Sequence, residues 1–197
     1  MTRPHALVIG ASRGIGLGLV RELASRGWTV VGTARDLGKA TELTALAAAS
    51  GDAVRTAVVD TADAASAEAL RDSLKDAVFD LVLVNAGVGG PQDMNTRTVS
   101  REAFTTLFVT NALAPVRLAE LLVKAVKPRT GVIGLMTSQL GSVEGASAGG
   151  FELYRASKAA LNSFTRSFAA RHKDRGIACF LCIPDGSGPP WAAPARR

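Results

Sequence analysis

Short runs of apolar residues alternate along the chain with longer stretches in which apolar residues recur every three to four positions. The short runs predict buried strands, and the longer stretches predict amphipathic helices. The predicted strands are residues 5–10, 28–34, 54–59, 79–84, 131–137 and 177–183. The predicted helices are residues 14–26, 38–50, 63–77, 101–127 and 152–173. This alternation predicts an α/β fold, a doubly wound parallel sheet with helices on both faces.

The alternation continues as far as Pro184 without a linker or a low-complexity segment. We therefore expect one domain over residues 1–184. Residues 185–197 are rich in Gly, Pro and Ala and show neither pattern, so we expect a disordered tail there. Ligands of doubly wound sheets bind beyond the carboxyl ends of the strands. The residues that follow each predicted strand are therefore the candidates for a functional site.

The first predicted strand runs into a glycine-rich turn with the spacing G-x-x-x-G-x-G. A helix that begins after such a turn directs free backbone N–H groups and the positive end of its dipole at one point, which favours phosphate. Glycine permits the tight turn and the close approach of a pyrophosphate. We expect this turn to bind a dinucleotide. The turn residues assigned to the cofactor are Gly10, Ser12, Arg13, Gly14, Ile15 and Gly16.

The end of the second strand indicates which dinucleotide binds. A free ribose 2′-hydroxyl usually meets an acidic residue at this point, whereas a 2′-phosphate favours a cation. Arg35 follows the strand, and Arg13 in the glycine turn can reach the same phosphate. The two arginines favour NADP(H). NAD(H) remains an alternative because Asp36 can fold back towards the ribose.

The third and fourth strands also end in candidate cofactor residues. Asp60 and Thr61 follow the third strand, where a carboxylate can hold the adenine amino group. Alternatively, Asp60 is the N-cap of the helix that begins near Asp63. The segment Asn85-Ala86-Gly87 follows the fourth strand and places small residues beside the cofactor. Alternatively, Asn85 ties neighbouring strands together.

A hydroxyl, a phenol and an amine follow the fifth strand. Ser138 comes directly after it, and Tyr154 and Lys158 are one helical turn apart on the same face of the next predicted helix. Free tyrosine has a pKa of about 10. A neighbouring lysine ammonium, helped by an oxidised nicotinamide, would favour the phenolate and lower that pKa. Taken alone, the pair is better explained as two ordinary solvent-facing side chains.

Together these motifs resemble the short-chain dehydrogenase/reductase family, and within it the small C-factor-like members. The family's glycine motif is matched by Gly10, Gly14 and Gly16, and its N-A-G motif by Asn85-Ala86-Gly87. Its catalytic tetrad is matched in identity and order by Asn111, Ser138, Tyr154 and Lys158. The resemblance covers residues 4–184 and implies a three-layer α/β/α Rossmann fold.

The resemblance also implies a reaction, the transfer of a hydride between the nicotinamide of NADP(H) and a carbonyl or alcohol substrate. Tyr154 would be the general acid or base, Lys158 would hold the nicotinamide ribose, and Ser138 would steady the substrate oxygen. Asn111 would help a water chain to resupply the proton; alternatively, it bonds local backbone within its helix. Pro184, after the sixth strand, is also assigned to the cofactor.

The end of the chain departs from the family. Family members continue after strand six with Pro-Gly, a hydroxyl residue, a substrate lid and a last strand, whereas Pro184 is followed by Asp185 and Gly186. Codons that fit Pro184 to Ala193, read one base earlier, encode Pro-Gly-Trp-Val-Arg-Thr-Ala-Met-Gly-Gly. We therefore expect a reading-frame shift near Leu181, a missing lid and last strand, and impaired activity. The sixth strand would then have an unpaired edge.

The truncated end gives weight to an alternative function, a non-catalytic nucleotide-binding or C-factor-like signalling protein. The charge does not indicate a nucleic-acid partner: the net charge is +6, but the basic residues are scattered without interleaved aromatics. No signal peptide and no apolar run of membrane-spanning length is recognised, so we expect a cytoplasmic protein with no membrane partner.

The two cysteines do not indicate a metal or redox site. Cys179 and Cys182 lie three residues apart in the apolar run of the sixth strand, so their side chains point to opposite faces. The predicted helices 101–127 and 152–173 carry apolar residues beyond a single stripe. The family buries such helices between subunits, which implies a homodimer or homotetramer.

Overall fold

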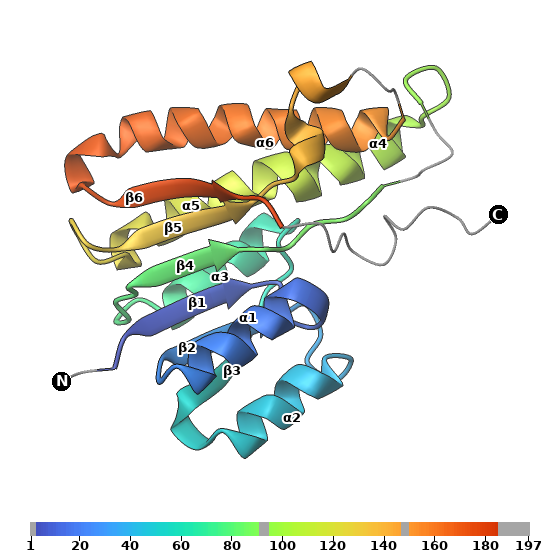
Figure 1. Cartoon of the computed structure of the whole chain (residues 1–197). Coiled ribbons are helices and arrows are strands. Elements are labelled where there is room, and N and C mark those ends of the chain that lie inside the picture. The colour runs from blue at the N-terminus through green and yellow to red at the C-terminus, as the bar shows by residue number, and fades with distance from the viewer. Residues whose placement is uncertain (1–2, 91–94, 147–149, 185–197) are drawn as a thin grey trace.

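The computed structural model of the chain describes residues 3–90, 95–146 and 150–184. Six parallel strands form one sheet in the order β3-β2-β1-β4-β5-β6 (Figure 1). The strands are β1 (His5–Ile9), β2 (Thr29–Ala34), β3 (Val54–Val58), β4 (Leu81–Val84), β5 (Val132–Met136) and β6 (Ala178–Cys182). The helices are α1 (Gly14–Ser25), α2 (Thr41–Ala49), α3 (Ala64–Ser73), α4 (Arg101–Phe108), α5 (Ala114–Leu122) and α6 (Glu152–Arg171). The predicted doubly wound α/β fold is confirmed.

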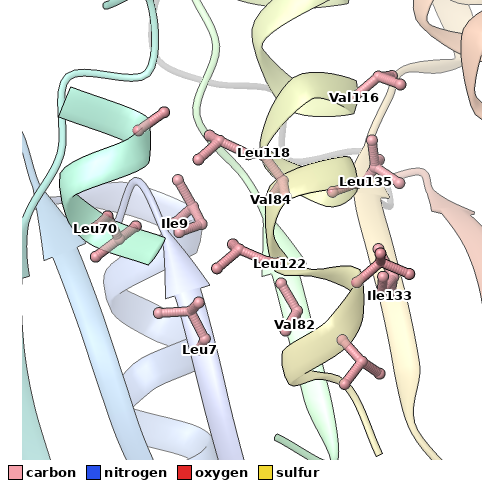
Figure 2. Close-up of a cluster of buried hydrophobic side chains, with 14 of the residues drawn as sticks. Leu7, Ile9, Leu70, Val82, Val84, Val116, Leu118, Leu122, Ile133 and Leu135 are labelled. Carbon is pink, nitrogen blue, oxygen red and sulfur yellow. The ribbon is translucent and has the colours of Figure 1, made fainter. Parts of the chain in front are cut away.

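The sheet is buried between two apolar cores because successive side chains of each strand point to opposite faces. On β1, Ala6 and Val8 belong to the core beneath α1 and α2. Leu7 and Ile9 belong to the larger core on the other face, beneath α3, α5 and α6. Figure 2 shows this larger core between the sheet and the helices. Strand β1 therefore stands at the centre of the molecule and holds the glycine turn at its end.

Helices α4 and α5 are joined by a π-helical turn, Val109–Leu113, and run as one continuous helix from Arg101 to Ala125. This helix is long and apolar enough to cross a membrane, so the prediction that no apolar run reaches that length is wrong. However, 56% of its most apolar window is buried inside the protein. Its α5 part packs on β4 and β5, which accounts for its hydrophobicity as a core helix.

Strand β6 lies at one edge of the sheet, and among the described residues it pairs with β5 alone. The expected unpaired edge is therefore present in this part of the chain. The prediction of a fully buried strand is wrong, because Phe180 is 41% exposed and Cys179 and Cys182 are half-buried free thiols. The described ranges hold no cluster of potential metal ligands. The expectations for residues 185–197 lie outside the described residues.

Candidate active site

The glycine turn after β1 is packed so closely that side chains are excluded. Gly10 has φ +82°, and a Cβ there would lie 2.8 Å from backbone atoms of Ala86, after β4. A Cβ on Gly16 would overlap the carbonyl oxygen of Gly10. Asn85 donates from Nδ2 to that same oxygen at 2.8 Å, so it ties the end of β4 to the turn, as its alternative interpretation predicted. The turn therefore joins β1, α1 and the segment after β4 at one point.

The first turn of α1 lacks the groups that usually satisfy its backbone N–H donors. Arg13 is the N-cap residue and makes no side-chain capping hydrogen bond, and no acidic residue lies in the first turn. Ser12, Arg13 and Gly14 are exposed, and Ile15 is half-buried. A helix N-terminus with free N–H groups and a positive dipole end favours an anion. The geometry thus fits the predicted pyrophosphate site.

The residues after β2 favour a phosphate over a ribose hydroxyl. Arg35 is exposed directly beyond the strand. The Asp36 carboxylate accepts from the Gly38 backbone N–H at 2.9 Å and lies 3.5 Å from the Lys39 amine, so it is engaged in its own turn. Within the described residues, neither Arg35 nor Arg13 forms an ion pair with a carboxylate. Both guanidinium groups are therefore available to an anionic ligand.

The segments beyond β3 and β6 contribute half-buried groups to the same side of the sheet. The Asp60 carboxylate accepts from the Ala62 backbone N–H at 3.0 Å. The interpretation of Asp60 as the helix N-cap is wrong, because Asp63 fills that position and accepts from the Ala65 N–H. Thr61 lies beside Asp60, and Pro184 directly follows β6.

Asn111 lies in the π-helical turn and is fully buried. Its side chain grips the backbone of Val88, accepting from the N–H at 2.8 Å and donating to the carbonyl oxygen at 2.8 Å. The interpretation of Asn111 as a residue that bonds backbone within its own helix is therefore wrong. It also donates to Ser157 Oγ at 3.1 Å. A Cβ on Gly87 would contact both Asn111 and the amine of Lys158, so these two side chains meet beside Gly87.

Tyr154 and Lys158 are buried on the face of α6 that packs towards β5. Tyr154 is 8% exposed and Lys158 is 3% exposed, so the interpretation as a solvent-facing pair is wrong. The Lys158 amine donates to the Met136 carbonyl at 2.9 Å and lies 5.8 Å from the centre of the Tyr154 ring. A side-chain hydrogen bond joins Tyr154 to Ser138. The structure thus brings together all four residues of the predicted tetrad.

Burial shifts the protonation of the tyrosine and the lysine in opposite directions. It raises the pKa of Tyr154, and the hydrogen bond from Ser138 offsets only part of this rise. Burial also lowers the pKa of Lys158 to about 8. The prediction that Lys158 lowers the pKa of Tyr154 is therefore wrong for the protein's own groups. Tyr154 is a protonated phenol at neutral pH, which suits a proton donor.

Sequence reasoning missed several residues that hold the site. Fully buried Thr33 accepts through its hydroxyl from the Gly10 backbone N–H at 3.2 Å. Ser157, between Tyr154 and Lys158 in the chain, is fully buried beside Asn111. Asn162 contacts the turn that carries Ser138. No motif marks these positions, because each acts on a segment far away in the sequence.

Comparison with known proteins agrees with this geometry. A family model described as short chain dehydrogenase matches residues 4–195. The 3-oxoacyl-[acyl-carrier-protein] reductase FabG of Escherichia coli (strain K12) is 32% identical over 183 residues, which cover 91% of this chain and 71% of that protein.

Two solved structures are also similar. One is described as a short-chain dehydrogenase/reductase from Burkholderia multivorans with bound NADP, with a TM-score of 0.89 and 44% identity over 93% of this chain and 79% of the other. The second is a carbonyl reductase from Pseudomonas aeruginosa PAO1 in complex with NADP, with a TM-score of 0.87 and 37% identity over 92% of this chain and 82% of the other. The chain therefore belongs to the short-chain dehydrogenase/reductase family.

Proposed function

We propose that the protein is an NADP(H)-dependent oxidoreductase that interconverts a carbonyl compound and the corresponding alcohol. The observation that supports this most directly is the buried cluster at the end of β5. There the Tyr154 phenol is hydrogen-bonded to Ser138 and the Lys158 amine lies beside its ring. A protein that only bound a nucleotide would have no need of a buried proton donor and a buried amine at the same point.

The residues fit the cofactor. The turn around Gly10 excludes side chains, and the first turn of α1 has free N–H groups for a pyrophosphate. Arg13 and Arg35 would bind the 2′-phosphate, since Asp36 is engaged elsewhere. The two similar structures from B. multivorans and P. aeruginosa are both described with NADP. When bound, the nicotinamide supplies or accepts the hydride.

The side chains divide the rest of the chemistry. In the reductive direction, the Tyr154 hydroxyl donates its proton to the substrate oxygen, and in the oxidative direction the phenolate accepts that proton. The Ser138 hydroxyl orients the same oxygen. The positive charge of Lys158 favours the phenolate that remains after proton donation. Asn111, held by Val88 and Ser157, fixes the segment beside the lysine.

Turnover and cofactor binding distinguish this function from a non-catalytic role. The purified chain is titrated with NADPH and NADH and then assayed with a panel of aldehydes and ketones. Tyr154→Phe is expected to bind NADPH as the wild type does and to lose at least about 10²-fold in turnover. Ser163→Ala, at an exposed position of the same helix, serves as the control. Cofactor binding without turnover in the wild type would favour a nucleotide-binding or signalling protein instead.

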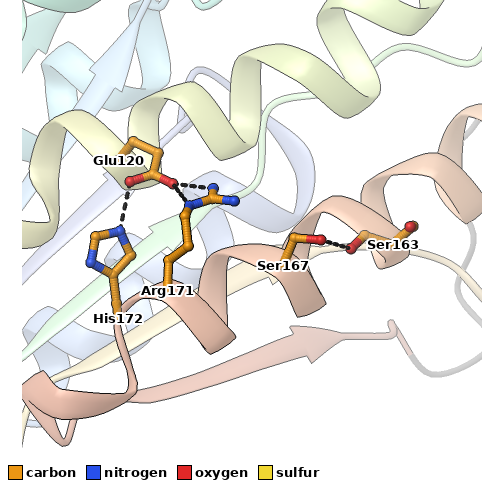
Figure 3. A network of polar contacts seen from close by, with 5 residues as sticks. All are labelled: Glu120, Ser163, Ser167, Arg171 and His172. Carbon is orange, nitrogen blue, oxygen red and sulfur yellow. Dashed lines mark hydrogen bonds and ion pairs between the residues drawn. The ribbon is translucent and has the colours of Figure 1, made fainter.

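The outer face of α5 and α6 is the surface that we propose for self-association. It forms a groove of about 400 Å³ whose apolar lining includes Leu113 and Phe164, which are 43% and 45% exposed. Beside the groove, Glu120 on α5 binds Arg171 and His172 at the end of α6 (Figure 3). Phe164→Glu is expected to shift a homo-oligomer towards monomers in sedimentation, and an unchanged mass would contradict this assignment.

A further inference from the structure

Asn162 continues the row of site residues along α6, one turn beyond Lys158 and two turns beyond Tyr154. Its amide oxygen accepts from the Thr137 hydroxyl at 2.6 Å, and its amide nitrogen donates to the Gly141 carbonyl at 3.3 Å. Thr137 and Gly141 stand on either side of the 3₁₀ turn that Ser138 begins. One side chain of α6 therefore holds both ends of the segment that presents Ser138.

The turn fits against α6 with no room to spare. A Cβ on Gly141 would lie 2.9 Å from the Asn162 amide nitrogen and 3.1 Å from the Lys158 Cβ. The turn is closed internally, because the Gly141 N–H donates to the Ser138 carbonyl at 2.9 Å and the Leu140 N–H donates to the Ser138 hydroxyl at 3.2 Å. A closed turn moves as a unit, so its outer anchors decide where the Ser138 hydroxyl lies.

The other anchors lie upstream of the serine. The Lys158 amine donates to the Met136 carbonyl at 2.9 Å, and the Thr137 N–H donates to the Cys182 carbonyl at 2.8 Å. Both contacts hold the end of β5. Asn162 supplies a side-chain hydrogen bond on the far side of Ser138, at Gly141.

We propose that Asn162 is a positioning residue that sets the separation between the Ser138 and Tyr154 hydroxyls. Its catalytic consequence rests on the proposed function, whereas its effect on Tyr154 can be measured without substrate. A displacement of about 1 Å at a reacting group can cost about 10²-fold in rate. Asn162→Ala lets the turn relax by less than this, so we expect a loss of about tenfold in kcat.

The kinetic test compares Asn162→Ala with Thr137→Val and with the double variant. Both single variants are expected to lower kcat with little change in the KM for NADPH, because neither residue belongs to the cofactor turn. The double variant is expected to be no slower than Asn162→Ala, since both changes break one coupled contact. Asn162→Asp keeps the acceptor for Thr137 and should recover part of the rate. A rate for Asn162→Ala equal to that of the exposed control Ser163→Ala would overturn the proposal.

The second readout follows Tyr154 itself. It is the only tyrosine in the chain, so the ultraviolet absorbance of tyrosinate against pH reports its pKa directly. The hydrogen bond from Ser138 lowers the pKa of Tyr154, so loosening the turn is expected to raise it, in the same direction as Ser138→Ala. Asn162→Ala with a lower Tm but an unchanged tyrosine titration would show a purely structural role and overturn the proposal. If the wild type shows no turnover, the proposed function fails while this titration still decides the role of Asn162.

Discussion

The Asn111 amide donates to the Ser157 hydroxyl at 3.1 Å, and both side chains are fully buried. Ser157 in turn donates to the Tyr154 carbonyl at 2.7 Å, and Asn111 grips the backbone of Val88. One series of hydrogen bonds thus joins the segment after β4, the π-helical turn and α6. π-helical turns occur often at functional sites, and here the turn delivers Asn111 into the space between two elements.

Ser157→Ala removes the acceptor of a buried Asn111 N–H. Leaving a buried donor unpaired costs about 1–3 kcal/mol, so we expect the free energy of unfolding to fall by that amount. The measurement is equilibrium urea unfolding of Ser157→Ala beside Ser163→Ala, which should change by no more than about 0.5 kcal/mol. Equal stabilities of the two variants would mean that the Asn111–Ser157 bond contributes nothing.

Two glycines of the same region should respond oppositely to alanine. Gly10→Ala places a Cβ against Ala86 in a backbone conformation with φ +82°, so we expect lost stability and lost NADPH binding. A Cβ on Gly18, in the middle of α1, meets no heavy atom within 4 Å. Gly18→Ala should therefore raise the free energy of unfolding by about 0.5–1 kcal/mol and leave binding intact. NADPH fluorescence and urea unfolding of both variants test this, and normal NADPH binding by Gly10→Ala would show that the turn is not the cofactor site.

Local patterns were sufficient to predict much of this molecule, because strands buried on both faces are apolar throughout and the glycine turn is contiguous. They could not give the sheet order, so the apolar run of β6 was predicted as buried although Phe180 lies exposed at the sheet edge. They also could not give contacts such as Thr137 to Asn162, 25 residues apart. Tyr154 and Lys158 were found from their spacing, but their burial, and hence their pKa shifts, depends on the packing of α6 on β5.

Arg35 should decide the choice between the two nicotinamide cofactors. Charge-assisted hydrogen bonds to a phosphate contribute about 1.5–3 kcal/mol, so Arg35→Ala should raise the Kd for NADPH about tenfold or more. NADH lacks the 2′-phosphate, and its Kd should hardly change. Asp36→Asn is the matched control, because its side chain is engaged with Gly38 rather than facing a ligand. An equal loss of affinity for both cofactors would contradict the assignment of Arg35 to the 2′-phosphate.

Lys158 gives the stability of the protein a pH dependence whose sign follows from its burial. Burial lowers the pKa of this amine from 10.5 to about 8. Between about pH 8 and pH 10 the unfolded chain keeps a proton that the folded chain has lost, so the free energy of unfolding rises with pH in this interval. Below about pH 8 the folded state carries the buried charge at a cost of about 3 kcal/mol. The raised pKa of Tyr154 acts in the opposite direction, but only above its ordinary value of 10.0.

Lys158→Met removes this cost and also the hydrogen bond to the Met136 carbonyl, which contributes about 1 kcal/mol. At pH 7 the variant should therefore be more stable than the wild type by about 2 kcal/mol, although the proposed function predicts that it is inactive. The difference should shrink as the pH rises from about 8 to 10, because the wild-type lysine then loses its charge in the folded state. Urea unfolding at several pH values, with the exposed Lys124→Met as control, measures both effects. A variant that is less stable than the wild type by the same amount at every pH would show that the amine is not held at a cost.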